Sequence, residues 1–231
     1  GGAALPVALL LVTVASYRLG LWVRQRAGGR QAAQPVVVSI AVTAVVISLL
    51  GVDYPTYADA ATLVSFWLGP ATVALALPLH RQVARLRGVR LPMLVAIPVG
   101  AVVSIATAYG LAVLCGASEA LALTMSPKAA TTPVSIALAE QVGGFPALTA
   151  VVTVTAGIVG AVLGPTLLTY ARVRDKRARG LAIGASSHGI GTSRALVDDE
   201  TEGAFSGLSM GLTALATSVL LPAVLLVVDL I

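Results

Sequence analysis

Long apolar runs separated by short polar segments dominate the chain. Four stretches contain no Asp, Glu, Lys or Arg, and they cover residues 31–52, 91–118, 141–171 and 203–228. A helix needs about 20 apolar residues to cross a hydrocarbon layer of about 30 Å, and each of the four stretches is at least that long. The pattern therefore predicts an all-α polytopic membrane protein.

The apolar segments predict about six to eight transmembrane or re-entrant elements. In chain order they cover 3–22, 36–51, 57–80, 91–115, 118–142, 145–170 and 203–229. Two of them contain residues that break helices, at Leu68-Gly69-Pro70 in the third segment and between Ser126 and Pro133 in the fifth. We expect these two segments to form broken helices or hairpins.

An internal repeat is suggested by these two interrupted segments. Residues 69–77 resemble residues 126–139, and each stretch is followed by a span that begins with an apolar residue and a proline. Transporters are often built from such repeats, with their binding sites at paired broken helices. Chance similarity between helices rich in Ala, Leu and Val is the alternative.

Composition and charge placement support the membrane prediction. Only 11% of the 231 residues are charged, against about 25% in soluble domains. Most basic residues fall in three loops, with members Arg24, Arg26 and Arg30, then Arg81, Arg85, Arg87 and Arg90, then Arg172, Arg174, Lys176, Arg177 and Arg179. Short basic loops stay cytoplasmic, although binding of anionic lipid headgroups is an alternative role.

These patterns predict one integral membrane domain, residues 1–231, embedded in a lipid bilayer. They exclude a soluble enzyme and argue against a nucleic-acid partner, although the net charge is +5. All three basic loops lie on the cytoplasmic side if 57–80 crosses the membrane and 118–142 enters and returns. The sequence leaves open whether each of the two segments crosses or is re-entrant.

The first candidate site is centred on Lys128. Between residues 91 and 171 the only charged side chains are Glu119, Lys128 and Glu140. A lysine at membrane depth costs a few kcal/mol, so we expect it to have a role. The alternatives are that Lys128 pairs with one of the two glutamates or reaches the interface.

The neighbours of Lys128 indicate an anion. Pro127 and Pro133 leave helix amides unpaired, and such amides attract negative charge. Hydroxyl groups are supplied by Ser126, Thr131 and Thr132. A cation, hydroxyls and free amides together predict a site for a small carboxylate.

The second candidate site lies within residues 186–194. Arg194 can bind a carboxylate through two hydrogen bonds, and Thr192 offers a hydroxyl. His188 titrates near neutral pH, so it can carry a coupled proton; the alternative is a structural histidine. The acidic run 198–202 is expected to form a solvated turn, or else a salt bridge to Arg194 that gates the site.

No catalytic chemistry is predicted. Ser187 and His188 have no buried acid nearby in the sequence and no nucleophile elbow, so a hydrolase triad is not expected. With two His and one Cys in the chain, the sequence shows no metal-ligand spacing, and we expect neither a metal nor a cofactor.

Two strings carry a resemblance to a known family. They are Pro127-Lys128-Ala129-Ala130-Thr131-Thr132-Pro133 and Ser187-His188-Gly189-Ile190-Gly191-Thr192-Ser193-Arg194. With them, and with the closing 202–206, the chain resembles the LrgB family of bacterial inner-membrane proteins from its first span to its last.

The resemblance implies two functions. Bacterial members are described as antiholin-like proteins that modulate murein-hydrolase activity and autolysis together with a small LrgA-type membrane partner. The plant relative exchanges glycolate and glycerate, and bacterial pairs have been linked to pyruvate uptake. We therefore expect a multi-pass protein of the bacterial inner membrane that transports a small monocarboxylate, with an antiholin-like regulator as the alternative. A homo-oligomer and an LrgA-type partner are also expected.

Overall fold

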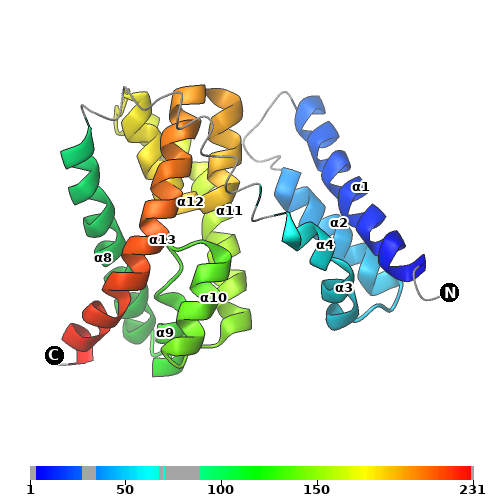
Figure 1. Cartoon of the computed structure of the whole chain (residues 1–231), viewed down its shortest axis with the longest axis horizontal. Helices are drawn as coiled ribbons and strands as arrows, with labels where there is room; N and C mark the ends of the chain where they lie inside the picture. The colour runs from blue at the N-terminus through cyan, green and yellow to red at the C-terminus, as the bar shows by residue number, and fades with distance from the viewer. Residues whose placement is uncertain (1–3, 28–34, 68–69, 71–88, 230–231) are drawn as a thin grey trace. The chain divides into compact units, whose positions relative to one another are not determined.

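A computed structural model describes residues 4–27, 35–67, 70 and 89–229 (Figure 1). All regular secondary structure in these residues is helical. The chain forms two compact units, Gly1–Ala74 and Leu75–Ile231, and each is described here by itself.

The first unit contains helices α1 (Ala4–Arg26), α2 (Pro35–Leu49), α3 (Tyr54–Ala60) and α4 (Thr62–Phe66). Helices α1 and α2 correspond to the first two predicted spans. They approach closely at Gly20, where a Cβ would lie 2.5 Å from the Pro35 carbonyl oxygen, so the contact depends on a residue without a side chain. Thr13 of α1 hydrogen-bonds Tyr57 of α3 at 2.9 Å.

Parts of two predictions lie outside the described residues. The break at Leu68-Gly69-Pro70 is described only at Pro70, and the first copy of the possible repeat, 69–77, is almost wholly outside. The loop with Arg81, Arg85 and Arg87 is outside as well. The repeat and the path of 57–80 therefore stay predictions.

The second unit contains six helices within its described residues. They are α8 (Arg90–Leu114), α9 (Glu119–Met125), α10 (Thr132–Gln141), α11 (Pro146–Tyr170), α12 (Lys176–Asp198) and α13 (Glu200–Asp229). Helices α8, α11 and α13, like α1, are long and apolar enough to cross a membrane. The predicted fold class, an all-α polytopic membrane protein, is confirmed.

Residues 118–142 form a hairpin, here called the first hairpin, made of α9 and α10. It packs against the C-terminal parts of α8 and α13, with Ala122 and Leu138 in one core cluster with Tyr109 and Leu221. In this hairpin, the Thr124 hydroxyl accepts a 2.8 Å hydrogen bond from the backbone amide of Phe145, which directly precedes α11. The hairpin therefore enters and returns at the end of the unit where α11 starts (Figure 1).

Helix α12 is a second hairpin, which lies outside the membrane segments predicted from the sequence. Its two helical halves join at His188, whose φ of 48° and ψ of −139° are not helical. A straight helix would separate Lys176 from Asp199 by roughly 35 Å. Instead the Lys176 Nζ and Asp199 Oδ2 atoms lie 4.0 Å apart. Both ends of this second hairpin therefore lie at the end of the unit where α11 finishes.

Glycines allow the second hairpin to pack tightly on α13. A Cβ at Gly184 would lie 2.1 Å from the Ser206 carbonyl oxygen, and one at Gly180 would lie 2.2 Å from that of Glu202. A Cβ at Gly191 would meet Ile183 at 2.8 Å, so the two halves of the hairpin are also in close contact. Small residues at such positions let helix backbones approach in lipid, where packing replaces the hydrophobic effect.

Candidate functional site

The breaks of the two hairpins meet beside the middle of α11. The imidazole of His188, at the break of the second hairpin, interacts with the backbone of Lys128 and Ala129, at the break of the first. On α11, a Cβ at Gly157 would lie 3.3 Å from the His188 Nδ1 atom. Two irregular backbone segments thus come together inside the protein, which is where such segments are tolerated at membrane depth.

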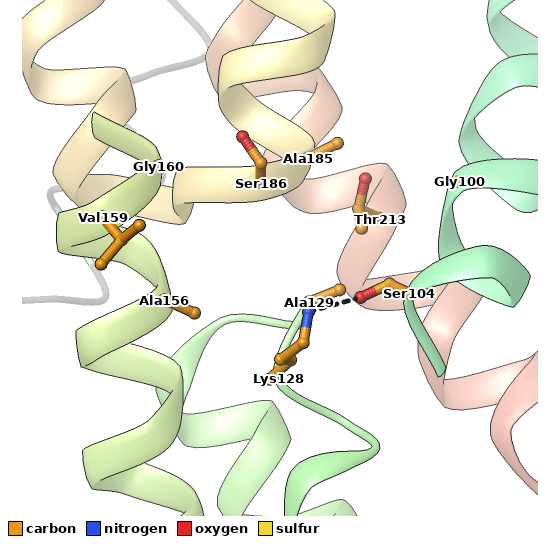
Figure 2. Close-up of a pocket in the computed structure, with 10 residues that line it drawn as sticks. All are labelled: Gly100, Ser104, Lys128, Ala129, Ala156, Val159, Gly160, Ala185, Ser186 and Thr213. Carbon is orange, nitrogen blue, oxygen red and sulfur yellow. Dashed lines mark hydrogen bonds between the residues drawn. The ribbon is translucent and has the colours of Figure 1, made fainter. Parts of the chain in front are cut away.

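A cavity of about 450 Å³ lies at this meeting point (Figure 2). Its walls come from both hairpins and from α8, α11 and α13, and most of the side chains are small. The lining residues are Gly100, Ser104, Lys128, Ala129, Ala156, Val159, Gly160, Ala185, Ser186 and Thr213. Lys128 is the charged residue among them, so the cavity is electropositive.

Lys128 is held toward the cavity by the break in the first hairpin. Its ammonium group donates a 3.1 Å hydrogen bond to the Ser104 hydroxyl of α8 (Figure 2). The Ser135 hydroxyl lies within hydrogen-bond distance of the carbonyl oxygens of Pro127, at 2.7 Å, and Ala130, at 3.0 Å, and the Pro127 carbonyl oxygen also accepts from the Ala130 amide at 2.9 Å. In the described residues Lys128 pairs with neither Glu119 nor Glu140, so the ammonium remains available to an anion.

The other predicted residues of the first hairpin support the backbone. Ser126 is buried and its hydroxyl donates to the Leu123 carbonyl oxygen at 2.7 Å. Thr131 is the N-cap residue of α10 and Thr132 is its first residue. None of the three lines the cavity. Their positions fit a role in ending and restarting the helix around Lys128.

Thr192 and Arg194 also lie away from the cavity. The Thr192 hydroxyl donates to the His188 carbonyl oxygen at 2.7 Å and hydrogen-bonds the Ser206 hydroxyl at 2.8 Å, so it fastens the second hairpin to α13. Arg194 hydrogen-bonds the Ala161 carbonyl oxygen of α11 and pairs with Asp198 at 3.3 Å. The structure therefore does not bring Arg194 and Lys128 together around one carboxylate.

Three hydroxyl residues line the cavity, namely Ser104, Ser186 and Thr213. Ser186 is the first residue of the second candidate stretch, whereas Ser104 and Thr213 were not predicted. Ser104 and Thr213 sit in uncharged spans, where the sequence does not show which face of the helix points inward. The Thr213 hydroxyl is buried and has no hydrogen-bond partner, so it can serve a ligand.

In the predicted acidic turn, Asp198 and Glu200 are exposed, as expected, and Asp198 also pairs with Arg194, which was the stated alternative, whereas Glu202 is buried. Glu202 is only 4% exposed, and its carboxylate accepts hydrogen bonds from Lys176 at 3.1 Å and Arg179 at 3.3 Å. Because those two basic residues lie in the first turn of the second hairpin and Glu202 lies in the first turn of α13, this cluster joins the N-terminal ends of the two elements.

Asp175 begins the second hairpin as its N-cap residue, in the loop before α12. Its carboxylate accepts a 2.8 Å hydrogen bond from the backbone amide of Arg177 and pairs with the Arg177 guanidinium at 2.6 Å. These contacts lower the pKa of the Asp175 carboxyl from its usual value to about 2. The carboxylate thus contributes stability that is complete above about pH 4 and is lost as the pH falls through about 2.

We expect Asp175→Ala to lower the stability by about 1 kcal/mol at neutral pH, because the helix loses its cap. Asp175→Asn should cost less, since its amide oxygen still accepts the backbone hydrogen bond and the lost ion pair is exposed. Thermal unfolding of the purified variants in detergent measures this order. An equal loss in both variants would mean that the charge, and not the cap, carries the effect.

In the described part of the chain, no group of three or more His, Cys, Asp or Glu side chains is placed to hold a metal ion. The cavity instead combines one ammonium group, three hydroxyls and apolar walls. Such a surface can hold a small anion by charge and orient it by hydrogen bonds.

Comparison with known proteins gives a consistent family. The family model of the LrgB-like family matches residues 13–227. The chain is 33% identical to the protein YwbG of Bacillus subtilis (strain 168) over 183 residues, which are 79% of this chain and 81% of that protein. It is 29% identical to the antiholin-like protein LrgB of Bacillus mycoides (strain KBAB4), over 92% of this chain and 93% of that protein. No solved structure matches the chain significantly.

Proposed function

The chain belongs to the LrgB-like family, and from this premise and the cavity at Lys128 we propose that it is a secondary transporter of small monocarboxylates. The substrates are of the glycolate, glycerate or pyruvate type, and the membrane is the bacterial inner membrane. One observation carries the proposal: the Lys128 ammonium lies in a cavity where two broken hairpins meet, and within the described residues it forms no ion pair with Glu119 or Glu140.

The chemistry of the cavity supports a small anion as the substrate. A carboxylate can replace Ser104 as the partner of Lys128 or share the ammonium with it. The hydroxyls of Ser186 and Thr213 then face the other end of a short acid, where they can hydrogen-bond a hydroxyl or keto group. A volume of about 450 Å³ accommodates such an acid together with water, because ligand pockets start at about 300 Å³.

The hairpins supply a route for alternating access. The first hairpin enters from the end of the unit where α11 begins, and the second enters from the end where α11 finishes. A site between their breaks opens to one side when one hairpin moves and to the other side when the other moves. Transporters with paired broken helices commonly place their sites in this way. Within the proposal, a homo-oligomer and an LrgA-type subunit complete the working assembly.

Uptake of labelled acids tests the proposal directly. Purified protein in liposomes, with and without an LrgA-type partner, is given radiolabelled glycolate or pyruvate, and protein-free liposomes report passive leakage. We expect saturable uptake of at least one acid, and faster uptake when the same unlabelled acid is trapped inside. Uptake no faster than in protein-free liposomes, under both conditions, would reject transport.

The name antiholin-like protein LrgB, which two of the relatives carry, is compatible with a second candidate function. In this second proposal the chain is a regulator of murein hydrolases that acts with an LrgA-type partner and does not transport. The two functions separate in a strain that lacks the gene. If autolysis changes in that strain and a transport-inactive Lys128→Ala protein restores it, the protein acts as a regulator. If only transport-competent protein restores it, the change in autolysis follows from transport.

Cavity size gives a prediction about the substrate. A Cβ added at Gly100 would meet no atom within 4 Å, so a larger side chain there fills the cavity without displacing the backbone. We expect Gly100→Val to raise the KM for glycerate or pyruvate more than the KM for the smaller glycolate, by on the order of tenfold for each heavy group excluded. Competition between the acids for uptake measures the change. Equal effects on all three acids would place the substrate elsewhere.

A further inference from the structure

His188 occupies an unusual position for a titratable residue. Its side chain is buried at the break of the second hairpin, and the residue is only 6% exposed. Its Nε2 atom is buried and has no hydrogen-bond partner. Buried polar atoms normally have partners, so an exception calls for an explanation in function.

The backbone conformation at His188 also indicates a functional role for this residue. Its φ of 48° combined with a ψ of −139° lies in a region where L-residues other than glycine are rare. Glycines stand at 189 and 191, so the break could have been made without placing a histidine at the strained position. Strain of this kind is kept at sites where the side chain is needed.

The charged groups around His188 are few. Lys128, at the break of the first hairpin, acts on the imidazole electrostatically. On its own helix, Arg194 is engaged by Asp198 and the Ala161 carbonyl oxygen. On α13, the charged residue nearest along the helix is Glu202, which is held by Lys176 and Arg179, and α11 has no charged residue over 146–170. Lys128 therefore dominates the local charge.

We propose that His188 binds the proton that moves together with the anion, an inference that rests on the proposed transport function. The imidazole takes up one proton from the side where the cavity is open and releases it on the other side. A carboxylate at Lys128 adds a negative charge close to the imidazole and favours its protonated form. By linkage, the protonated imidazole increases the affinity for the carboxylate by the same factor. One monocarboxylate and one proton then cross together with no net charge.

The test measures proton movement and anion uptake in the same liposomes. Purified protein is reconstituted with a trapped fluorescent pH indicator, and labelled glycolate and pyruvate are added separately. We expect inward uptake by the wild type to acidify the interior beyond protein-free liposomes. We also expect its apparent affinity to fall on the order of tenfold as the external pH rises through the range in which the imidazole loses its proton.

The variants His188→Gln and His188→Gly remove the titratable group, and the glycine also suits the strained backbone. Both should retain exchange of labelled for unlabelled acid while losing the acidification and the pH dependence of affinity. His80→Gln, at the other histidine of the chain, is the matched control and should behave as the wild type.

Three outcomes would count against the proposal, and they are distinguishable. Wild-type uptake without acidification excludes proton coupling, and this measurement decides even if both variants fail to fold. Acidification that persists in His188→Gln or His188→Gly assigns the proton to another group. No uptake by the wild type, with or without an LrgA-type partner, rejects the transport function itself and the coupling with it.

Discussion

Replacing Lys128 with alanine is expected to reduce uptake of glycolate and pyruvate by about 30- to 4,000-fold at subsaturating substrate. The estimate follows from the about 2–5 kcal/mol that is lost when one member of a buried, hydrogen-bonded charge pair is removed. Here the pair is the ammonium and the bound carboxylate. The loss should appear mainly in the apparent affinity, because no other cation lines the cavity among the described residues.

Two further variants make this result specific to binding. Lys128→Arg keeps the charge but changes its geometry, so we expect it to retain part of the uptake. Arg194→Ala serves as the matched control, because the structure places that guanidinium on Asp198 and the Ala161 carbonyl oxygen. It should lower stability and leave the KM of the folded protein nearly unchanged. A normal KM in Lys128→Ala, or a large KM increase in Arg194→Ala, would relocate the anion site.

The spans and the break within 118–142 could be predicted from the sequence because lipid imposes strong rules, whereas the sequence left open whether this segment crosses the membrane or returns. A run without charges must be helical at membrane depth, and the segment with Pro127 and Pro133 cannot continue as one helix. Lys128 was found for the same reason, since a charge is costly there and needs a function. The structure places it in the cavity beside Ser104.

The second hairpin could not be predicted in the same way. It reverses at His188, where no proline marks the break, and its glycines are equally compatible with a continuous, flexible helix. Its fold depends on contacts with α13 that are remote in sequence, such as Gly184 against Ser206. The hydrogen-bond and ion-pair partners of Thr192 and Arg194 could not be predicted from the sequence either, because they too depend on tertiary contacts. Their residue types suited an anion, but tertiary contacts assigned them to backbone and to Asp198.

The cluster at Glu202 gives the second large prediction. Glu202→Ala removes a buried carboxylate and leaves Arg179, whose side chain is 14% exposed, without its acidic partner. Breaking a buried ion pair costs about 3–5 kcal/mol, and we expect about 2–3 kcal/mol here because Lys176 is half exposed. The negative charge also stabilises the N-terminus of α13, which adds to the loss.

The substitution Glu202→Ala should loosen the structure around residue 202 as well as lower the overall stability. Arg179 also donates to Thr169 and to the Val173 carbonyl oxygen, so the cluster joins the end of α11, the start of the second hairpin and the start of α13. We therefore expect Glu202→Ala to lower the apparent Tm in detergent and to speed proteolysis in the loop 171–175. Glu202→Gln should lie between it and the wild type, because the amide oxygen still accepts a hydrogen bond. Glu140→Ala, at an exposed carboxylate of α10 that forms no ion pair among the described residues, is the control with a small expected effect. A Tm for Glu202→Ala equal to that of Glu140→Ala would show that the buried cluster does not hold the hairpin to α13.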